Sequence, residues 1–216
     1  MIRNLTIALG TMALLTGCDA VEQQVVLSSA LELSAMEPDS NQVPVRRVWA
    51  RAGDYASPSP DGRYIAFTDW STGDVAIHDI VTGEDQRLTD KGSWTEDGSW
   101  SEEPLFSPDG NRVAYSYGNA KGMQSHQYEL RVVTIGDTTQ TVLYALTPED
   151  DWIMATDWHS SQGILVEIFR GERHDFAIEL AIVDPESGAV RVLRSFGQDQ
   201  DFPHAGAISP DGRFVV

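Results

Sequence analysis

The chain has one cysteine, few basic residues and no apolar run long enough to cross a bilayer as a helix. A single cysteine cannot form an internal disulfide, and it cannot supply the several thiolates that a structural zinc site normally uses. The 33 acidic residues outnumber the 15 basic ones, which gives the 216 residues a formal net charge of −18. Because nucleic acid repels such a chain, the composition excludes nucleic acid as a partner.

The short motifs that mark common active sites are also missing. The sequence has no Gly-x-Ser-x-Gly, no Gly-x-Gly-x-x-Gly, no phosphate-binding loop and no His-Glu-x-x-His. The five histidines are 15 to 48 residues apart, which favours positions on the rim or on strand surfaces over metal ligation. We therefore expect no catalytic residue, no metal site and no cofactor within these residues.

Residues 1–17 have the pattern of an export signal. Arg3 precedes Leu5–Leu15, an uncharged stretch of 11 residues, which is about half of the ~20 that a membrane-spanning helix needs. The stretch ends in Leu-Thr-Gly-Cys at residues 15–18, which resembles the lipobox of bacterial lipoproteins, where the cysteine is acylated and becomes the first residue. The resemblance implies a lipid on Cys18. The alternative is an ordinary secretory signal or a buried N-terminal helix.

A lipid on Cys18 implies attachment to a membrane, because several acyl chains on one residue exceed the two signals that stable anchoring needs. Asp19 resembles the signal that retains lipoproteins of enteric-type bacteria at the inner membrane. We therefore expect a cell-envelope protein, anchored to the inner membrane and facing the periplasm. Residues 18–42 are polar at both ends, with a turn-rich exit at Pro38–Asn41, and we interpret them as the lipidated cysteine and a tether.

From residue 43 onward the sequence has strand character and contains a repeat. Ser-Pro-Asp-Gly followed by an apolar run begins at Ser59, Ser107 and Ser209, and a diverged copy begins at His159 after Trp158. A period near 50 in an all-strand pattern indicates propeller blades. Pro fixes φ before the turn, Asp bonds its own backbone two residues on, and Gly supplies a positive φ. The motif therefore predicts a tight turn between two strands.

Three further strands are expected in each repeat after this turn or its diverged copy. The expected second strands are Tyr64–Asp69, Val113–Tyr117 and Ile164–Phe169; the third are Val75–Ile80, Glu129–Ile135 and Ala177–Asp184; the fourth are Gln86–Thr89, Gln140–Tyr144 and Val190–Arg194. Val43–Ala50 also has strand character. Asp and Gly share one spacing in residues 79–83 and 184–188, which predicts a second hairpin. Four antiparallel strands make a blade.

The Ser-Pro-Asp-Gly turns, the Asp-x-x-Thr-Gly hairpin at residues 79–83 and Arg-Leu-Thr at residues 87–89 resemble the WD-like blades of bacterial TolB-type β-propellers. The resemblance implies an all-β fold over residues 43–216, with three four-stranded antiparallel blades and a stub, in an incomplete ring. A closed ring of six to eight blades needs roughly 300 to 400 residues. We therefore expect these residues to be the N-terminal part of a longer protein.

Residues 90–103, between the first two repeats, combine two tryptophans with several acids. Trp94 and Trp100 are suited to stacking, and Asp97 and Glu102 to attracting a cation or a basic partner, so these four residues form the candidate binding loop. The alternative is a solvated acidic loop whose tryptophans pack between blades.

Two functions are compatible with such blades, which occur both in scaffold proteins and in hydrolases. The first is a membrane-anchored exported propeller that binds or scaffolds a protein, peptide or other ligand, with a basic partner favoured by the acidic charge. The second is a propeller that gates the catalytic domain of an exported prolyl-oligopeptidase-like serine hydrolase, with that domain beyond residue 216. The binding module ranks first because no residue pattern favours catalysis.

The lipobox resemblance leads to a direct test. Cys18→Ser removes the only thiol in the chain, so we expect the variant to take up no fatty acid and to be found as an unprocessed or a soluble exported form instead of a lipidated membrane form. Growth with a radioactive fatty acid, followed by fractionation, measures both. A wild-type protein that takes up no label would contradict the assignment.

Overall fold

The computed structural model describes residues 47, 49, 55–90, 95, 98–119, 127–137, 139–147, 150–171, 177–197 and 206–216. The expected export signal, Cys18 and the tether lie outside the described residues. Of the expected strand Val43–Ala50, only Arg47 and Trp49 are described, and neither lies in a strand. Within the described ranges, no helix has the length and apolar character needed to cross a membrane.

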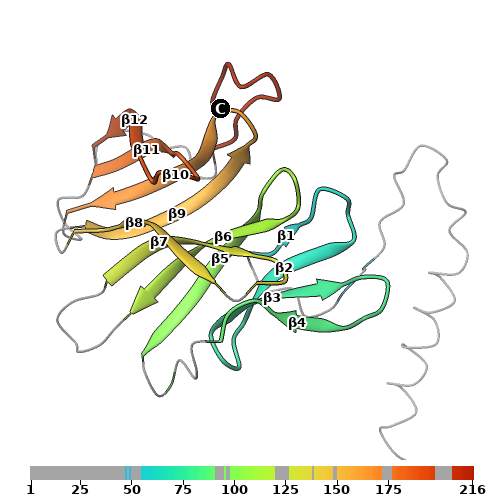
Figure 1. Cartoon of the computed structure of the whole chain (residues 1–216). Helices are drawn as coiled ribbons and strands as arrows, with labels where there is room; N and C mark the ends of the chain where they lie inside the picture. Colours follow the sequence, from blue (N-terminus) through green and yellow to red (C-terminus); the bar gives the residue numbers. More distant parts are fainter. Residues whose placement is uncertain are drawn as a thin grey trace, which may run out of the picture. The chain divides into compact units, whose positions relative to one another are not determined.

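The described residues form three four-stranded antiparallel sheets, each with its strands in chain order (Figure 1). The first sheet contains β1 (Ser57–Pro58), β2 (Tyr64–Asp69), β3 (Asp74–Asp79) and β4 (Asp85–Arg87). The second contains β5 (Ser99–Phe106), β6 (Arg112–Asn119), β7 (Gln127–Thr134) and β8 (Gln140–Ala145). The third contains β9 (Asp150–His159), β10 (Gly163–Arg170), β11 (Ala177–Val183) and β12 (Val190–Phe196). The expected second, third and fourth strands are confirmed to within two residues at each end.

The three sheets are consecutive blades of an incomplete β-propeller. The first strand of each sheet contacts the first strand of the next, β1 with β5 and β5 with β9, so these strands form the inner edge of the arc. Past the third blade, Ile208 and Val215 form an antiparallel bridge, which is the first pairing of a fourth unit. The ring is not closed, and the expected fold class is confirmed.

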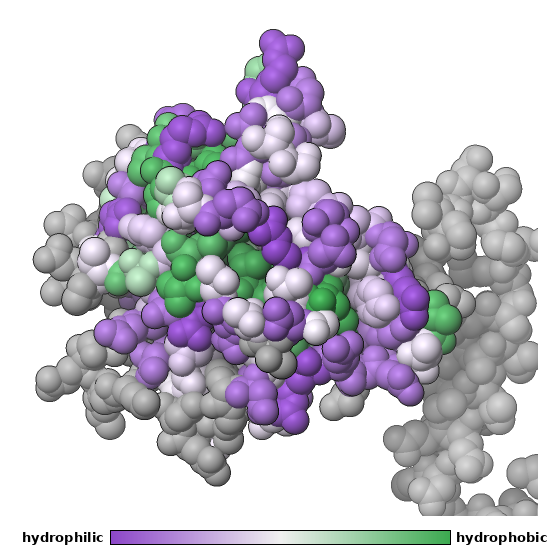
Figure 2. Space-filling view, in the orientation of Figure 1, coloured by the Kyte–Doolittle hydropathy of each residue, from purple (hydrophilic) through white to green (hydrophobic). Residues whose placement is uncertain are grey.

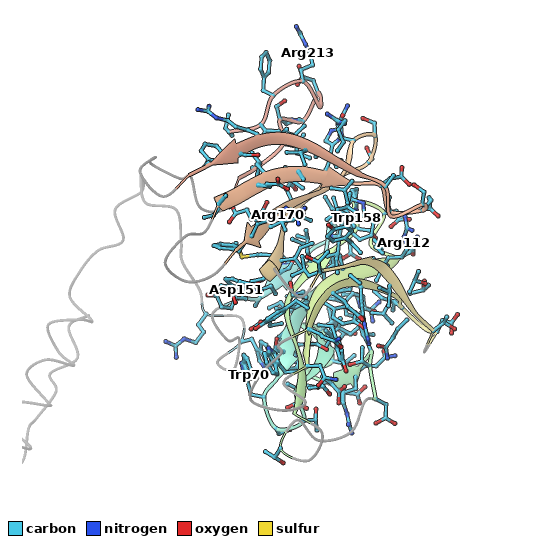
Figure 3. The ribbon with its side chains drawn as sticks, turned by 90° about the vertical axis from the view of Figure 1, so that its left-hand side faces the viewer. Trp70, Arg112, Asp151, Trp158, Arg170 and Arg213 are labelled. Atoms are coloured by element: carbon cyan, nitrogen blue, oxygen red, sulfur yellow. The ribbon has the colours of Figure 1, made fainter. Side chains whose placement is uncertain are left out.

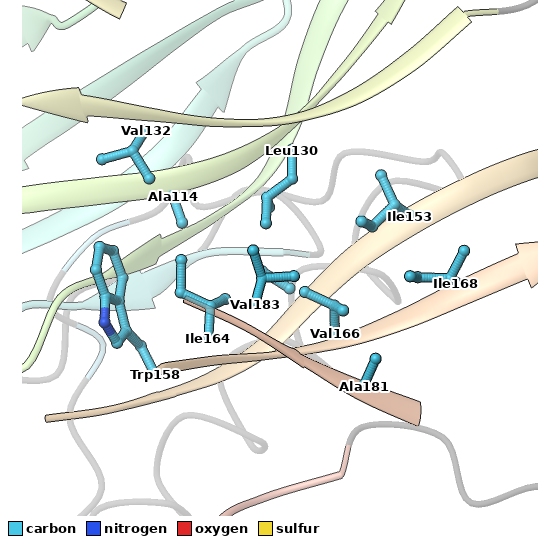
Figure 4. Packing of buried hydrophobic residues seen from close by; sticks show 11 residues of the cluster. Ala114, Leu130, Val132, Ile153, Trp158, Ile164, Val166, Ile168, Ala181 and Val183 are labelled. Carbon is cyan, nitrogen blue, oxygen red and sulfur yellow. The ribbon is translucent and has the colours of Figure 1, made fainter. Parts of the chain in front are cut away.

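Apolar side chains fill the two spaces between neighbouring blades. Between the first and second blades, Val75 and Ile77 of β3 pack with Val113 and Tyr115 of β6. Between the second and third blades, eleven buried residues form a larger cluster in which Leu130 of β7 meets strands of the third blade (Figure 4). The second blade thus buries one face against the first blade and the other against the third.

Charged groups join the second and third blades at the rim. The Arg112 guanidinium donates to Glu186 Oε1 at 2.8 Å, and its Cζ atom lies 5.1 Å from the centre of the Trp158 ring. Figure 3 shows Arg112 and Trp158 close together at this boundary. Elsewhere the surface is mixed, and Figure 2 shows hydrophilic residues surrounding an apolar patch on one face.

The Ser-Pro-Asp-Gly turns have the expected geometry. In the first, the Ser59 hydroxyl donates to Asp61 Oδ1 at 2.6 Å, and the Arg63 backbone N–H donates to the same oxygen at 3.0 Å. The second and fourth turns repeat both bonds. The serine hydroxyl, followed by the backbone N–H, holds the pKa of each turn aspartate below its ordinary value. These aspartates are therefore structural.

The diverged third turn replaces the serine and aspartate with one imidazole. The backbone N–H of Ser161 donates to Nδ1 of His159 at 3.2 Å, which takes the place of the bond to aspartate. The other ring nitrogen lies 3.2 Å from the carbonyl oxygen of Pro210 in the fourth turn. His159 therefore supports its own turn and contacts the next one.

Two equivalent glycines offer a test of blade packing. Gly83 and Gly188 close the same hairpin with φ of 76° and 70°. A Cβ on Gly83 would meet nothing within 4 Å, whereas one on Gly188 would lie 2.1 Å from the carbonyl oxygen of Leu143 in the second blade. We expect Gly83→Ala to cost about 1 kcal/mol of unfolding free energy through its backbone strain. Gly188→Ala must also displace β8 and is expected to cost several kcal/mol more.

Urea unfolding of the two variants measures this difference. Equal losses would show that the third blade's hairpin is not held against β8.

Candidate functional site

A cavity of about 520 Å³ lies at the inner edge of the arc, where β5 and β9 meet. Its walls include Glu103 and Leu105 from β5, and Trp152 and Met154 from β9. Phe169 of β10 completes an aromatic wall, since its ring centre lies 5.4 Å from that of Trp152. Its volume falls within the range of small-molecule sites, and its mainly apolar lining with a few polar groups is typical of them.

A bulge in β5 places Glu103 at this cavity. Glu102 pairs with Ser116 and Leu105 pairs with Ala114, so two residues of β5 lie opposite one residue of β6. Glu103 has a φ of 55° and is the only described residue other than glycine with a positive φ. This conformation costs on the order of 1 kcal/mol or more. Pro104 is compatible with the bulge because a proline cannot donate a ladder hydrogen bond.

The carboxyl group of Glu103 is buried with little compensation from the described residues. The residue is 5% exposed, and neither carboxyl oxygen has a hydrogen-bond partner among the described residues. The Ser116 hydroxyl nearby donates to the carbonyl oxygen of Ile153 at 2.6 Å. No described cation forms an ion pair with Glu103. A buried acid in this state is unfavourable when ionised.

Burial and like charges raise the pKa of Glu103 to about 8. Burial is the largest cause, and the charges of Glu102 and Glu167 add to it, while Ser116 opposes it. Burial also raises the pKa of Glu102, and burial, followed by the nearby acids, raises that of Tyr128 to about 12. At neutral pH Glu103 is therefore mostly a neutral carboxylic acid that can lose its proton when a cation approaches.

Two of the four residues of the candidate binding loop, Trp100 and Glu102, are described, and both lie on β5 without lining the cavity. Trp100 Nε1 donates to Glu102 Oε1 at 3.1 Å. The Trp100 ring packs edge-on to Tyr128, with the ring centres 5.9 Å apart. It also covers Gly118, where a Cβ would lie 2.6 Å from the indole. Trp94 and Asp97 lie outside the described residues.

The expectation of a single loop over residues 90–103 is wrong for its last part. Ser99–Phe106 is a strand, because its backbone pairs with β6 despite the acidic side chains. Glu103 belongs to the acidic segment 90–103 but was not among its four candidate residues, and sequence reasoning missed Glu167. A proline next to Glu103 inside a strand signals a bulge, and Glu167 interrupts the apolar run of residues 164–168, which signals a buried acid.

One histidine differs from the expectation of a rim or strand-surface position. His78 lies on β3 but is only 6% exposed. Its Nδ1 lies 2.6 Å from Asp85 Oδ1, and the Trp49 ring stacks on it with centres 4.4 Å apart. His126, His174 and His204 lie outside the described residues.

Comparison with known proteins finds no matching family model and no matching curated protein. Among solved structures, TolB from Acinetobacter baumannii is 17% identical with a TM-score of 0.48, covering 73% of this chain and 35% of that one. The periplasmic gluconolactonase of Pseudomonas aeruginosa is 21% identical with a TM-score of 0.44, covering 74% and 45%. Dipeptidyl peptidase 4 from Porphyromonas gingivalis is 12% identical with a TM-score of 0.49, covering 71% and 27%.

The chain thus spans less than half of the length of these three proteins. The assignment of a propeller rests on the three sheets and their packing.

The raised pKa of Glu103 predicts a pH-dependent stability. The native state keeps this proton until about pH 8, whereas the unfolded chain loses it near 4.5. The stabilisation by the protonated native form is complete below pH 4.5 and is lost as the pH rises to 8. Glu103→Gln has no such group to titrate and removes this loss. The difference in unfolding free energy between the variant and the wild type should therefore rise in favour of the variant from pH 5 to pH 8, by roughly 3 kcal/mol at pH 7.

Urea unfolding at several pH values measures the gain, with the exposed Glu84→Gln as a control that makes the same charge change. A gain that stays constant with pH would contradict the raised pKa.

Proposed function

We propose that the protein is a lipid-anchored propeller of the bacterial cell envelope that binds a ligand or protein partner in the cavity at its inner strands. The observation that carries the proposal is this cavity of about 520 Å³, whose apolar walls surround one buried acid. The export pattern of residues 1–17 and the lipobox-like Cys18 support the location.

The construction of the cavity walls supports binding. Most of its walls are strands of the second and third blades, so its shape is set largely by the core between them. Trp152, Phe169 and Met154 offer a large apolar contact area, and aromatic side chains are frequent anchors in binding sites. A preformed site of this kind saves the ordering cost that a flexible loop would add.

The charge of the protein indicates which partners reach this site. A net charge of −18 attracts basic molecules and repels acidic ones at moderate salt. A peptide or protein with a basic, partly apolar segment therefore suits both the surface and the cavity. This binding role ranks above gating of a hydrolase because the cavity is formed by the blades themselves.

The proposal is tested with an uncharged apolar probe, N-phenyl-1-naphthylamine, whose fluorescence rises in an apolar site. Thr156 lines the cavity and is half-buried, so Thr156→Trp places an indole in the cavity and should lower probe binding at least fivefold. Thr141→Trp makes the same change on exposed β8 and should leave binding unchanged. Thermal melts confirm that both variants fold.

Probe binding that survives in folded Thr156→Trp would contradict the proposed site. Equal loss in both variants would do the same, because it would place the probe elsewhere.

A further inference from the structure

We propose that the cavity accepts a primary ammonium group carried on an apolar chain, with the carboxylate of Glu103 as its counter-ion. This inference rests on the proposed function and names the chemistry of the ligand. Such a ligand requires three features: a single buried acid at an apolar cavity, acceptor atoms left free for a donor, and a negative local charge. The described residues supply all three.

Glu103 has the acceptor atoms that an ammonium group needs. It lines the cavity at 5% exposure, and both of its oxygens lack a hydrogen-bond partner among the described residues. A buried acceptor without a donor costs about 1–3 kcal/mol, and more when charged. An ammonium group carries three donors and no acceptor, so it satisfies these atoms without leaving an unpaired acceptor of its own.

The groups around Glu103 favour a cation over a neutral or anionic ligand. Glu102 on the same strand and Glu167 on β10 act on it as negative charges. The other groups on this side include the Ser116 hydroxyl on β6, the Tyr128 phenol on β7 and the Asp151 carboxyl group on β9. A cation beside Glu103 is attracted by the charge of carboxyl groups from two blades, whereas an anion would be repelled by it.

The apolar part of the ligand is determined by the remaining walls. Trp152, Phe169 and Met154 present aromatic and thioether surface to an alkyl or aryl chain, and an aromatic face also attracts a cation. Within the described residues, no group of three or more His, Cys, Asp and Glu is placed to hold a metal ion. The cavity therefore suits an organic cation better than an inorganic one.

Binding exchanges one proton for the ligand. The neutral carboxylic acid of Glu103 releases its proton to solvent, and the resulting carboxylate pairs with the R–NH₃⁺ group, so the charge within the cavity stays balanced. Below pH 8 the affinity for the amine should therefore rise with pH, by about fifty-fold between pH 6 and pH 8. A neutral ligand releases no proton and should show no such rise.

The experiment compares n-octylamine with its uncharged isostere 1-octanol by titration calorimetry on the full chain. We expect octylamine to bind more tightly at pH 8, to lose about fifty-fold at pH 6, and to release nearly one proton per molecule at pH 7. Octanol should bind equally at both pH values. Two buffers with different ionisation heats give the proton count.

A matched pair of variants assigns the effect to one carboxyl group. Glu103→Gln should abolish the preference for the amine and its pH dependence, while N-phenyl-1-naphthylamine still binds. Glu84→Gln makes the same charge change at an exposed site and should behave as wild type. The wild-type pH profile needs no variant, so the proposal remains testable if Glu103→Gln folds poorly.

Two peptides that are identical except for one position, which is lysine in one and norleucine in the other, identify the source of the ammonium group. Tighter binding of the lysine peptide assigns it to a protein partner, and octylamine binding without this difference assigns it to a free amine. Equal, pH-independent binding of octylamine and octanol would overturn the inference. If N-phenyl-1-naphthylamine still binds in that case, the proposed function stands without it; if no probe binds, the proposed function fails as well.

Discussion

Each blade of this protein can bury its apolar faces only against the blade next to it in the chain. The eleven-residue cluster between the second and third blades is the largest of these contacts. A similar apolar cluster lies between the first blade and the second. The hairpins must then fit a neighbouring blade as well as their own strands. Gly188 demonstrates this constraint, because its Cα faces the backbone of β8 with no room for a side chain.

The same packing explains how an unfavourable acid is held in place. The bulge in β5 keeps Glu103 in a left-handed conformation, and strands of two blades bury its carboxyl group beside two other acids. Neither feature improves stability. Backbone strain and a buried acid at one position are typical of functional sites, where the surrounding fold holds a residue in an unfavourable state.

The sequence predicts the parts of the fold whose causes are local. The Ser-Pro-Asp-Gly turns follow from the chemistry of four adjacent residues, and the strands after them follow from β-branched and apolar runs. β5 was missed because Trp100 and Glu102 suggest an exposed loop until β6 pairs with them. The burial and raised pKa of Glu103 could not be predicted from the sequence, because its surroundings are formed by Trp152 and Glu167, about 50 to 65 residues away in the chain.

Blade packing holds the carboxyl group of Glu103 buried and protonated beside a cavity. The most direct measurement is the pH titration of its side-chain carbon by NMR in the full chain, with the signal assigned from its absence in Glu103→Gln. The structure predicts a midpoint near pH 8. A midpoint near the ordinary 4.5 would show that the carboxyl group is solvated and would contradict the account.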